Sequence, residues 1–415
     1  MHYFQYRDGE LYAEDIPVRK LVQEYDTPLY VYSARTLRRH FQAFDSAFSG
    51  LDHLTCYSAK ANSNLCVLRL LGKMGAGADV VSGGELFRAL KAGIDPQKIV
   101  YSGVGKRENE IQEALLANIL MFNVESDQEL EKINQVAAGL NQTARISVRI
   151  NPDVDPKTHP YISTGLKKNK FGVDMDRALE IYKRTKELEH IEPLGIDCHI
   201  GSQLTSISPF LEALERIKGF HSRLADIGLD IKYLDLGGGL GITYDEEEPP
   251  HPVELGEALT ESLKDSGLKL ILEPGRVISG NAGILVTRVL YTKQTELKEF
   301  TVVDAGMNDL IRPSLYQAYH RIAPVREMGA ADIKMDIVGP ICESSDFLAQ
   351  DREMPALEPE DLLAVFSSGA YGFGMSSQYN SRTRAAELLV DGEEVTVARR
   401  REMYIDLIGL EDACF

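Results

Sequence analysis

The sequence lacks the features of a membrane-spanning, exported or nucleic-acid-binding protein. It has no apolar run of transmembrane length, and its first residues, MHYFQYRDGELYAED, do not resemble a signal or transit peptide. Lys and Arg number only 45 against 63 Asp and Glu, so the formal net charge of −18 has the wrong sign for a nucleic-acid backbone or an anionic membrane. We expect no nucleic-acid partner and no membrane partner.

Cysteine is also scarce. The five cysteines are odd in number and widely scattered, and none of them forms a C-x-x-C pair. This pattern argues against a disulfide framework and a zinc site, so we expect no bound metal and a reducing, cytoplasmic location. Because the chain is so acidic, a phosphate or an anionic substrate must be held by local arginines, lysines and backbone amides.

The first two thirds of the chain predict a parallel barrel. From residue 54 to residue 275, short β-rich runs alternate with longer stretches of helical period, as in repeated βα units. The candidate strands are residues 54–58, 78–82, 99–102, 120–124, 145–150, 194–200, 231–236 and 268–272. About eight strands close a (β/α)8 barrel. A doubly wound open sheet is the alternative, weakened by this count and by the absence of G-x-G-x-x-G after the first strand.

The remainder of the chain predicts an all-β domain. After residue 275 come β-rich runs such as ILVTRVLYT, FTVVDAG, MDIVGP and LLAVFSS, with few long helical patterns between them. The N-terminal residues suggest two strands joined at Asp8-Gly9, a hairpin that could pair with this sheet. The acidic, Pro-rich patch at residues 245–252 predicts a solvated loop.

Polar residues follow several candidate strands, where a parallel barrel places its catalytic groups. Lys60, in YSAKAN, closes the first strand and could form a Schiff base with an aldehyde cofactor. A lysine at a strand end is more often a solvated surface residue, so it needs support from its context. His199, in DCHIGSQ at the end of the sixth strand, is either a histidine satisfied within the core or an imidazole stacked on an aromatic cofactor ring.

The loops after the seventh and eighth strands are the ones that commonly bind phosphate in barrels. They contain DLGGGLG, residues 235–241, and EPGR, residues 273–276. Consecutive glycines let backbone N–H groups approach an anion, although a glycine run can also be merely a tight turn. It is no Walker A loop, because no Gly-Lys-Ser/Thr follows. If the cofactor is pyridoxal phosphate, the carboxylate of Glu273 would keep the pyridine nitrogen protonated, which favours decarboxylation over racemisation.

Further candidates lie in the β-rich region. NDLIRPSLY sets Arg312 and Tyr316 about one helical turn apart, and a guanidinium suits a substrate carboxylate. CESSD puts the thiol of Cys342 beside the carboxylate of Glu343, and GAYG places Tyr371 between flexible residues. Each also has an ordinary structural explanation, such as Cys342 being a small buried hydrophobe.

In this order and over nearly the whole chain, YSAKAN, HIGSQ, GGG, EPGR, NDLIRPSLY, CESSD and GAYG resemble the alanine-racemase-like, pyridoxal-phosphate-dependent group IV decarboxylases. YSAK, HIGS and EPGR are shared with ornithine and arginine decarboxylases, whereas NDLIRPSLY and CESSD are similar to the diaminopimelate branch. That branch converts meso-2,6-diaminopimelate to L-lysine and carbon dioxide, the last step of bacterial lysine biosynthesis. The resemblance implies a (β/α)8 barrel over residues 27–280 and a β-sandwich-like domain over residues 1–26 and 281–415.

The resemblance also implies a pyridoxal 5'-phosphate cofactor, an amino-acid substrate and a homodimer whose active site is shared between subunits. Lys60 would carry the cofactor, His199 would stack on its ring, and Cys342 of the other subunit would protonate the carbanion. The implied cofactor-binding residues are Lys60, His199, Gly239, Glu273, Pro274, Gly275, Arg276 and Tyr371. The implied substrate-binding residues are Arg276, Arg312, Tyr316, Glu343 and Tyr371, with Glu343, also from the partner subunit, recognising the distal amine.

Other functions stay open on the sequence alone. A related decarboxylase acting on ornithine, lysine, arginine or carboxynorspermidine would share the cofactor machinery. A non-catalytic homologue that regulates a true decarboxylase would keep the fold, although retention of Lys60, Glu273 and Cys342 argues against it. A Schiff-base aldolase on the same barrel would not need the GGG and EPGR elements.

Overall fold

The computed structural model describes residues 2–155, 170–330 and 332–411 and divides into two compact units. The barrel unit comprises His40–Thr243 and Glu247–Val277, and the β unit comprises Met1–Arg39, Tyr244–Glu246 and Ile278–Phe415. The domain limits expected from the sequence, residues 27–280 for the barrel, stay a prediction. Among the described residues, no helix is both long enough and apolar enough to span a bilayer.

Within the described part of the barrel unit, eight parallel strands close into a barrel in chain order. They are β5 (His53–Ser58), β6 (Gly77–Val80), β7 (Ile99–Tyr101), β8 (Met121–Val124), β9 (Ala144–Arg149), β10 (Ile191–Asp197), β11 (Tyr233–Asp235) and β12 (Lys269–Leu272). The last strand pairs with the first, so the sheet has no open edge. The predicted (β/α)8 barrel is confirmed, and each candidate strand overlaps an observed one.

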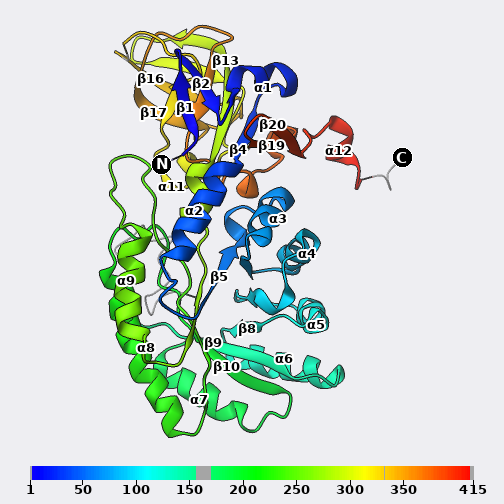
Figure 1. Cartoon of the computed structure of the whole chain (residues 1–415). Helices are drawn as coiled ribbons and strands as arrows, with labels where there is room; N and C mark the ends of the chain where they lie inside the picture. The colour runs from blue at the N-terminus through cyan, green and yellow to red at the C-terminus, as the bar shows by residue number, and fades with distance from the viewer. Residues whose placement is uncertain (1, 156–169, 331, 412–415) are drawn as a thin grey trace. The chain divides into compact units, whose positions relative to one another are not determined.

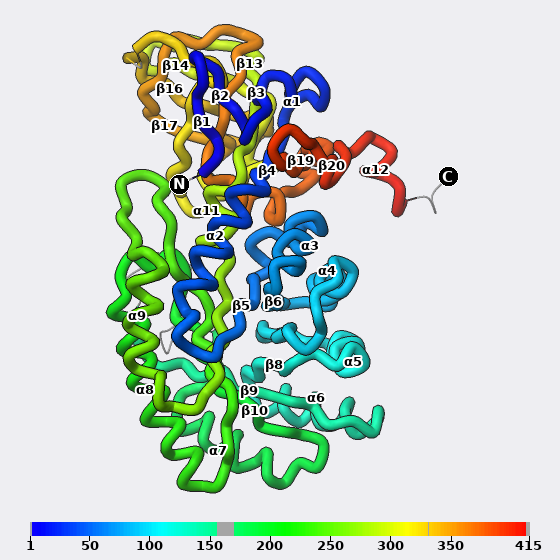
Figure 2. The backbone as a smooth tube through the Cα atoms, viewed as in Figure 1, coloured from blue at the N-terminus to red at the C-terminus, as the bar shows by residue number. Residues whose placement is uncertain are grey.

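Helices alternate with these strands and cover the outside of the barrel (Figure 1). They are α3 (Leu65–Lys73), α4 (Gly83–Ala92), α5 (Glu108–Ala117), α6 (Asp127–Gly139), α7 (Met175–Thr185), α8 (Ser208–Asp226) and α9 (Pro252–Leu263). The side chains of Asn64, Ser82 and Ser126 accept backbone N–H groups at the starts of α3, α4 and α6. Figure 2 traces the resulting alternation of strand and helix along the chain.

The two ends of the barrel differ in polarity. Cys56, Val100, Met121 and Ile271 belong to one apolar cluster inside it. Polar side chains occupy the carboxyl ends of the strands: Asp197 and Asp235 are the last residues of β10 and β11, and Lys60, Ser102 and Glu273 lie just beyond β5, β7 and β12. The chemistry of the barrel unit is therefore concentrated at the end where its loops lead into the helices.

Among the residues that the structure describes, the β unit contains two sheets. A small sheet has the order β1-β2-β3, and the 9-stranded sheet has the path β17-β16-β14-β13-β4-β19-β20, with β15 and β18 paired off it. Its strands are β1 (Phe4–Arg7), β2 (Glu10–Ala13), β3 (Ile16–Pro17), β4 (Leu29–Ser33), β13 (Gly283–Gln294), β14 (Glu299–Val303), β15 (Ile322–Pro324), β16 (Ile333–Val338), β17 (Phe347–Met354), β18 (Leu362–Val365), β19 (Ala386–Asp391) and β20 (Glu394–Arg399). Its helices are α1 (Val18–Tyr25), α2 (Ala34–Ser46), α10 (Arg276–Ser279), α11 (Arg312–Tyr316) and α12 (Tyr404–Ile408). Of these, α2 and α10 have residues in both units.

The predicted N-terminal hairpin is confirmed. Asp8 and Gly9 both have positive φ, 50° and 78°, and join β1 to β2. The hairpin meets the later part of the chain through a bridge from Glu10 to Arg326, rather than as a strand of the large sheet. The predicted loop at residues 245–252 is also observed, except that Pro252 begins α9.

Candidate active site

Lys60 lies in a short 3₁₀ turn, Ala59–Ala61, directly after β5. Its Nζ lies 2.9 Å from Oδ2 of Asp79 on β6, and the Asp79 side chain is fully buried. The Ser58 hydroxyl donates to the same oxygen at 2.6 Å. Burial, the largest influence, would raise the pKa of Asp79, but the charge of Lys60 and hydrogen bonds from Ser58 and Lys60 hold the pKa below its ordinary value. Asp79 is thus a buried anion that fixes the position of the Lys60 amine.

His199 follows β10 and is half-buried. Its Nδ1 accepts the backbone N–H of Gly238 at 3.1 Å, which places the proton of a neutral ring on Nε2. Burial lowers the pKa of His199 well below its ordinary value, and the charges of Arg149 and Lys60 lower it further. The ring is therefore a neutral, flat imidazole, which suits stacking on an aromatic cofactor.

The glycine run after β11 packs closely against its surroundings. A Cβ at Gly237, where φ is 64°, would lie 2.3 Å from Nδ1 of His199. A Cβ at Gly239, where φ is 120°, would lie 2.5 Å from the carbonyl oxygen of Gly201. Both the backbone conformation and the lack of space require glycine here. The run is thus more than a flexible turn, because its backbone defines the space beside His199.

The EPGR segment after β12 connects with neighbouring parts of the barrel unit. The carbonyl of Pro274 accepts the N–H of Ser58 at 3.0 Å, which ties this loop to the end of β5. Arg276 is buried, and its Nη2 donates to Oγ of Ser202 at 3.1 Å. The structure therefore brings the EPGR segment next to the end of β5, which precedes Lys60, and to the segment that follows His199.

Glu273 is buried among other carboxyl groups. Burial raises its pKa well above the ordinary value, and the charges of Asp235 and Asp79 raise it further. Burial also raises the pKa of Asp235 to about 6, although hydrogen bonds from Gly237, Asn123 and Glu273 lower it. Ser102 donates to Oε1 of Glu273 at 3.3 Å. Burial among these carboxyls therefore favours the protonated form of Glu273.

Asn123 on β8 joins polar side chains from neighbouring strands. Its Nδ2 donates to the hydroxyl of Ser102 at 3.0 Å and to Oδ2 of Asp235 at 3.3 Å, while its Oδ1 accepts the Ser147 hydroxyl at 2.6 Å. Asn123 thus donates to the Ser102 oxygen, and Ser102 in turn donates its own proton to Glu273. The network thereby fixes the groups around Glu273.

A buried ion pair lies on the adjacent strands. Nη1 of Arg149 lies 3.1 Å from Glu125, and its Nε lies 3.9 Å from Asp197. Burial raises the pKa of Asp197 well above its ordinary value, as does Asp235, whereas Arg149 lowers it. Arg149 therefore places a positive charge among the barrel carboxyls.

Sequence reasoning missed Asp79, Ser102, Asn123 and Arg149. Each lies inside or at the end of a candidate strand, and none belongs to a spaced motif. The available signal was an isolated polar residue in an otherwise apolar, buried strand, because such a side chain must find partners inside the barrel.

The β unit contains the remaining candidates. Arg312 and Tyr316 are the first and last residues of α11, one turn apart as expected. Arg312 is buried, and its Nη1 lies 2.8 Å from Nε2 of His320. Tyr371 is half-buried and has a φ of 55°, an uncommon conformation for a residue with a large side chain.

Cys342 and Glu343 both lie on the surface of the described chain. Cys342 is exposed, so its interpretation as a small buried hydrophobe is wrong. Its N–H donates to Oδ1 of Asn380 at 2.8 Å. Glu343 accepts hydrogen bonds from the Ser345 hydroxyl at 2.6 Å and the Tyr379 hydroxyl at 2.8 Å, and these bonds, in that order, lower its pKa. Glu343 is therefore an accessible anion beside an accessible thiol.

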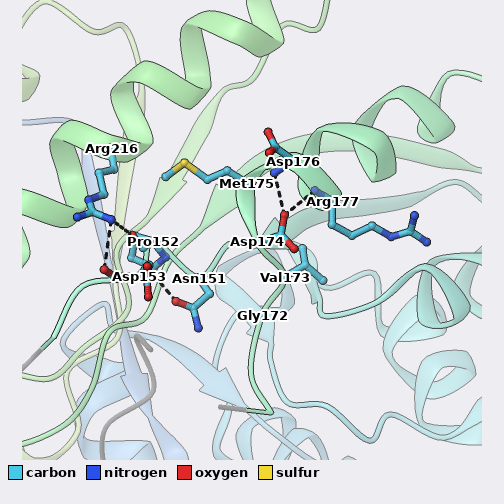
Figure 3. Close-up of a pocket in the computed structure, with 10 residues that line it drawn as sticks. All are labelled: Asn151, Pro152, Asp153, Gly172, Val173, Asp174, Met175, Asp176, Arg177 and Arg216. Atoms are coloured by element: carbon cyan, nitrogen blue, oxygen red, sulfur yellow. Dashed lines mark hydrogen bonds between the residues drawn. The ribbon is translucent and has the colours of Figure 1, made fainter. Parts of the chain in front are cut away.

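A pocket of about 710 Å³ lies beside the segment that follows β9 (Figure 3). Arg216 donates to the carbonyls of Pro152 and Asp153, and Asp174 accepts the first N–H groups of α7. No residue of the candidate site is among those that line this pocket in the described structure. Among the described residues, no group of three or more His, Cys, Asp or Glu is arranged to hold a metal ion.

Comparison with known proteins identifies the class. Residues 34–280 match the family model described as pyridoxal-dependent decarboxylase, pyridoxal binding domain. The parallel barrel, with Lys60, His199 and the glycine run at its strand ends, is thus the pyridoxal-binding domain of a pyridoxal-dependent decarboxylase.

Full-length relatives narrow the assignment. Diaminopimelate decarboxylase of Aquifex aeolicus (strain VF5) is 54% identical over 403 residues, 97% of this chain and 96% of the relative. That of Vibrio cholerae is 53% identical over 413 residues, 99% of each chain. The crystal structure of diaminopimelate decarboxylase from Helicobacter pylori complexed with L-lysine matches with a TM-score of 0.93 and 45% identity, over 96% of this chain and 100% of that one. The chain belongs to the diaminopimelate decarboxylase family.

Proposed function

We propose that this protein removes one carboxyl group from meso-2,6-diaminopimelate and releases L-lysine and carbon dioxide, as the last step of bacterial lysine biosynthesis. The observation that carries the proposal is that one end of one barrel holds both the Lys60 amine, paired with Asp79, and the buried carboxyl of Glu273. Relatives named diaminopimelate decarboxylase over the full length, and a similar structure complexed with L-lysine, support the choice of substrate.

The residues of the barrel unit fit pyridoxal phosphate. Lys60 supplies an amine at a strand end, His199 supplies a neutral flat ring, and the glycines at 237 and 239 let the backbone after β11 pass close to His199 and Gly201. Gly239 and the segment from Glu273 through Pro274 and Gly275 to Arg276 would hold the phosphate. When bound, the cofactor supplies an electron sink for the carbanion that remains after carbon dioxide leaves.

The barrel residues manage protons and charge around that group. Asp79 holds the Lys60 amine at the carboxyl end of β5, where it would attach the cofactor. The raised pKa of Glu273 favours its protonated form, and its carboxyl would share a proton with the pyridine nitrogen. Nδ1 of His199 is occupied by Gly238, so the imidazole cannot turn away from the position in which it would stack. Contacts within the barrel unit hold these groups in place, and side chains held in this way lose less conformational freedom when they bind a ligand.

We assign substrate recognition to the residues that the family resemblance implies. Arg276 and Arg312 would bind carboxylates, with Tyr316 and Tyr371 completing the set as hydrogen-bonding groups. A guanidinium for the distal carboxylate would favour diaminopimelate over ornithine, because the distal end of ornithine has no carboxylate. The accessible anion of Glu343 suits the distal ammonium group. Cys342 would give the proton that completes the product.

We infer that the protein is a homodimer whose partner supplies Cys342 and Glu343. Both residues are exposed in the single chain, and the C-terminal helix α12 exposes Tyr404, Ile405 and Ile408. An apolar helix of this kind gains free energy when a second copy covers it. Two inactive variants, Lys60→Ala and Cys342→Ala, should regain part of the activity when their subunits are mixed. If each site is complete within one chain, mixing restores nothing.

We also propose a cytoplasmic location and no nucleic-acid or membrane partner. The formal net charge of −18 opposes association with polyanions, and the four cysteines in the described residues form no disulfide bond, as expected in a reducing compartment.

The substrate assignment is tested by supplying meso-diaminopimelate, ornithine, lysine, arginine and carboxynorspermidine separately to the purified protein with pyridoxal phosphate. Carbon dioxide should come from meso-diaminopimelate alone. Release from another of these amino acids would move the protein to a sister branch. Release from none, with the cofactor bound, would favour a non-catalytic homologue.

A further inference from the structure

His320 is a fully buried histidine in the β unit, in the segment between α11 and β15. From its two ring contacts we propose that His320 is a positioning residue, which holds the guanidinium of Arg312 in the orientation that receives the distal carboxylate of the substrate. This inference rests on the proposed role of Arg312 in substrate binding. It adds a residue that would act on substrate recognition through Arg312.

The pairing of β15 with β18 sets the position of His320. These strands run antiparallel with Ile322 opposite Val365, and beyond their ends the N–H of Phe366 donates to the carbonyl of Arg321 at 2.8 Å. Nδ1 of His320 lies 2.8 Å from the carbonyl oxygen of Phe366. A carbonyl oxygen can only accept, so Nδ1 carries the proton.

The other ring nitrogen faces a donor. Nε2 of His320 lies 2.8 Å from Nη1 of Arg312. A guanidinium has N–H donors and no acceptor, so Nε2 must present its lone pair. The two contacts together define a neutral imidazole with its proton on Nδ1. In that state His320 accepts from Arg312 without neutralising its charge.

Tyr244 completes the support of the guanidinium. The central carbon of the Arg312 guanidinium lies 4.6 Å from the centre of the Tyr244 ring. The same ring meets the His320 imidazole edge-on, with 5.3 Å between centroids and 75° between planes. Arg312 is therefore held at one edge by a neutral acceptor and on one face by an aromatic ring. Both contacts preserve its positive charge for an anionic ligand.

The backbone of His320 is fixed as well. Nη1 of Arg352 donates to the carbonyl of His320 at 2.9 Å, and its guanidinium lies 4.1 Å from the centre of the Tyr319 ring. With its carbonyl and Nδ1 both bonded, the imidazole has little freedom to follow a displaced arginine. The orientation of Arg312 is thus determined by His320 rather than the reverse.

Two substitutions at His320 separate positioning from structural support. In His320→Asn, the short amide can still donate to Phe366 but cannot reach Arg312. In His320→Gln, the longer side chain can place an oxygen near the position of Nε2 and accept from Arg312. In the holoenzyme, we expect His320→Asn to raise KM for meso-diaminopimelate about tenfold, the effect of losing one hydrogen bond to a charged group. Its kcat and its affinity for pyridoxal phosphate should stay within about twofold of the original.

The glutamine variant should keep KM within about threefold of the original protein, because it retains the acceptor for Arg312. If His320 served only to support the fold, the glutamine variant would be the more impaired of the two, because only the asparagine variant keeps the bond to Phe366. A higher KM for His320→Gln than for His320→Asn would overturn the inference. If neither variant folds, Tyr244→Leu and Tyr244→Phe apply the same test to the aromatic face. Leucine should raise KM severalfold and phenylalanine should leave it unchanged, and equal KM values for the two would refute the inference.

Arg312→Ala separates this inference from the proposed function. If Arg312→Ala leaves KM for meso-diaminopimelate unchanged, the proposed role of Arg312 is wrong. If it raises KM while His320→Asn does not, only the inference is wrong. In the double variant, His320→Asn should raise KM less than about twofold beyond the value for Arg312→Ala alone, because the effects of two residues that act through one contact are not additive.

Discussion

The amine of Lys60 and the carboxylate of Asp79 form an ion pair of 2.9 Å in which the carboxylate is fully buried and the lysine side chain is 35% exposed. The asymmetry has a functional consequence. Asp79 cannot leave the barrel, so it fixes one end of the pair, while Lys60 keeps access to a ligand. An ion pair of this kind positions a reactive amine more than it stabilises the fold.

Replacing Asp79 should therefore weaken cofactor attachment. In Asp79→Asn, the amine of Lys60 loses its fixed counter-charge, and the affinity for pyridoxal phosphate should fall at least tenfold, the effect of about 1.4 kcal/mol. The measurement is a titration of the apoprotein followed by the visible absorption of bound cofactor. Asp52→Asn is the control, because Asp52 forms a surface ion pair with Lys269. Equal affinities for the two variants would contradict the role of Asp79.

The network centred on Asn123 should be costly to break. Asn123→Ala leaves Ser102, Ser147 and Asp235 each without one buried hydrogen bond, and we expect a loss of about 2 kcal/mol or more in the free energy of unfolding. The exposed Gln128→Ala should change it by less than about 0.5 kcal/mol. Urea unfolding of both variants measures the difference. A stability of Asn123→Ala equal to that of Gln128→Ala would show that the network is dispensable.

Gly237 should not tolerate a side chain. The Cβ of Gly237→Ala would lie 2.3 Å from Nδ1 of His199 in a backbone conformation with φ of 64°, so either the imidazole or the loop must move. We expect cofactor affinity to fall at least tenfold, the effect of about 1.4 kcal/mol. At Gly105 a Cβ has open space, and Gly105→Ala should bind the cofactor normally. Normal binding by Gly237→Ala would show that His199 need not occupy its observed position.

Glu85 predicts a defined pH dependence of stability. Burial, followed by the charge of Asp79, raises its pKa to about 7, although the N–H of Val81 lowers it. The folded chain therefore binds this proton more tightly than the unfolded chain, and the stability associated with it is lost as pH rises from about 4.5 to about 7. Glu85→Gln keeps an oxygen that can accept from Val81 and has no charge to bury.

Relative to the original protein, Glu85→Gln should thus become more stable as pH rises through this range. Thermal unfolding midpoints at several pH values between 4.5 and 8 measure the change. Midpoints of the two proteins that stay parallel would show that Glu85 ionises normally in the folded chain.

The barrel was predictable because each of its strands is a short apolar run between helical segments, and closure requires only that successive strands pair in order. The large sheet of the β unit was harder to predict. Strand β4 (Leu29–Ser33) pairs with β13 and β19, and β19 begins at Ala386. Sequence reasoning did not identify β4, because its partner strands are far away in the chain and no local turn indicates the pairing.

The candidate site divides in the same way. Lys60, His199 and Glu273 could be found because they follow strands, where a parallel barrel exposes its functional groups. Asp79 and Asn123 could not be assigned a role, because their partners come from other strands and depend on the geometry of the closed barrel. The contact between Arg312 and His320 likewise depends on the pairing of β15 with β18, so no local sequence motif predicts it.

The most direct test of the central claim is the stoichiometry of the reaction with meso-diaminopimelate as the sole amino acid. The protein should be stripped of cofactor, assayed, and assayed again after pyridoxal phosphate is restored. We predict no reaction without the cofactor and, with it, one carbon dioxide and one L-lysine for each diaminopimelate consumed. Cofactor-independent turnover, or loss of diaminopimelate without equal amounts of lysine and carbon dioxide, would contradict the account.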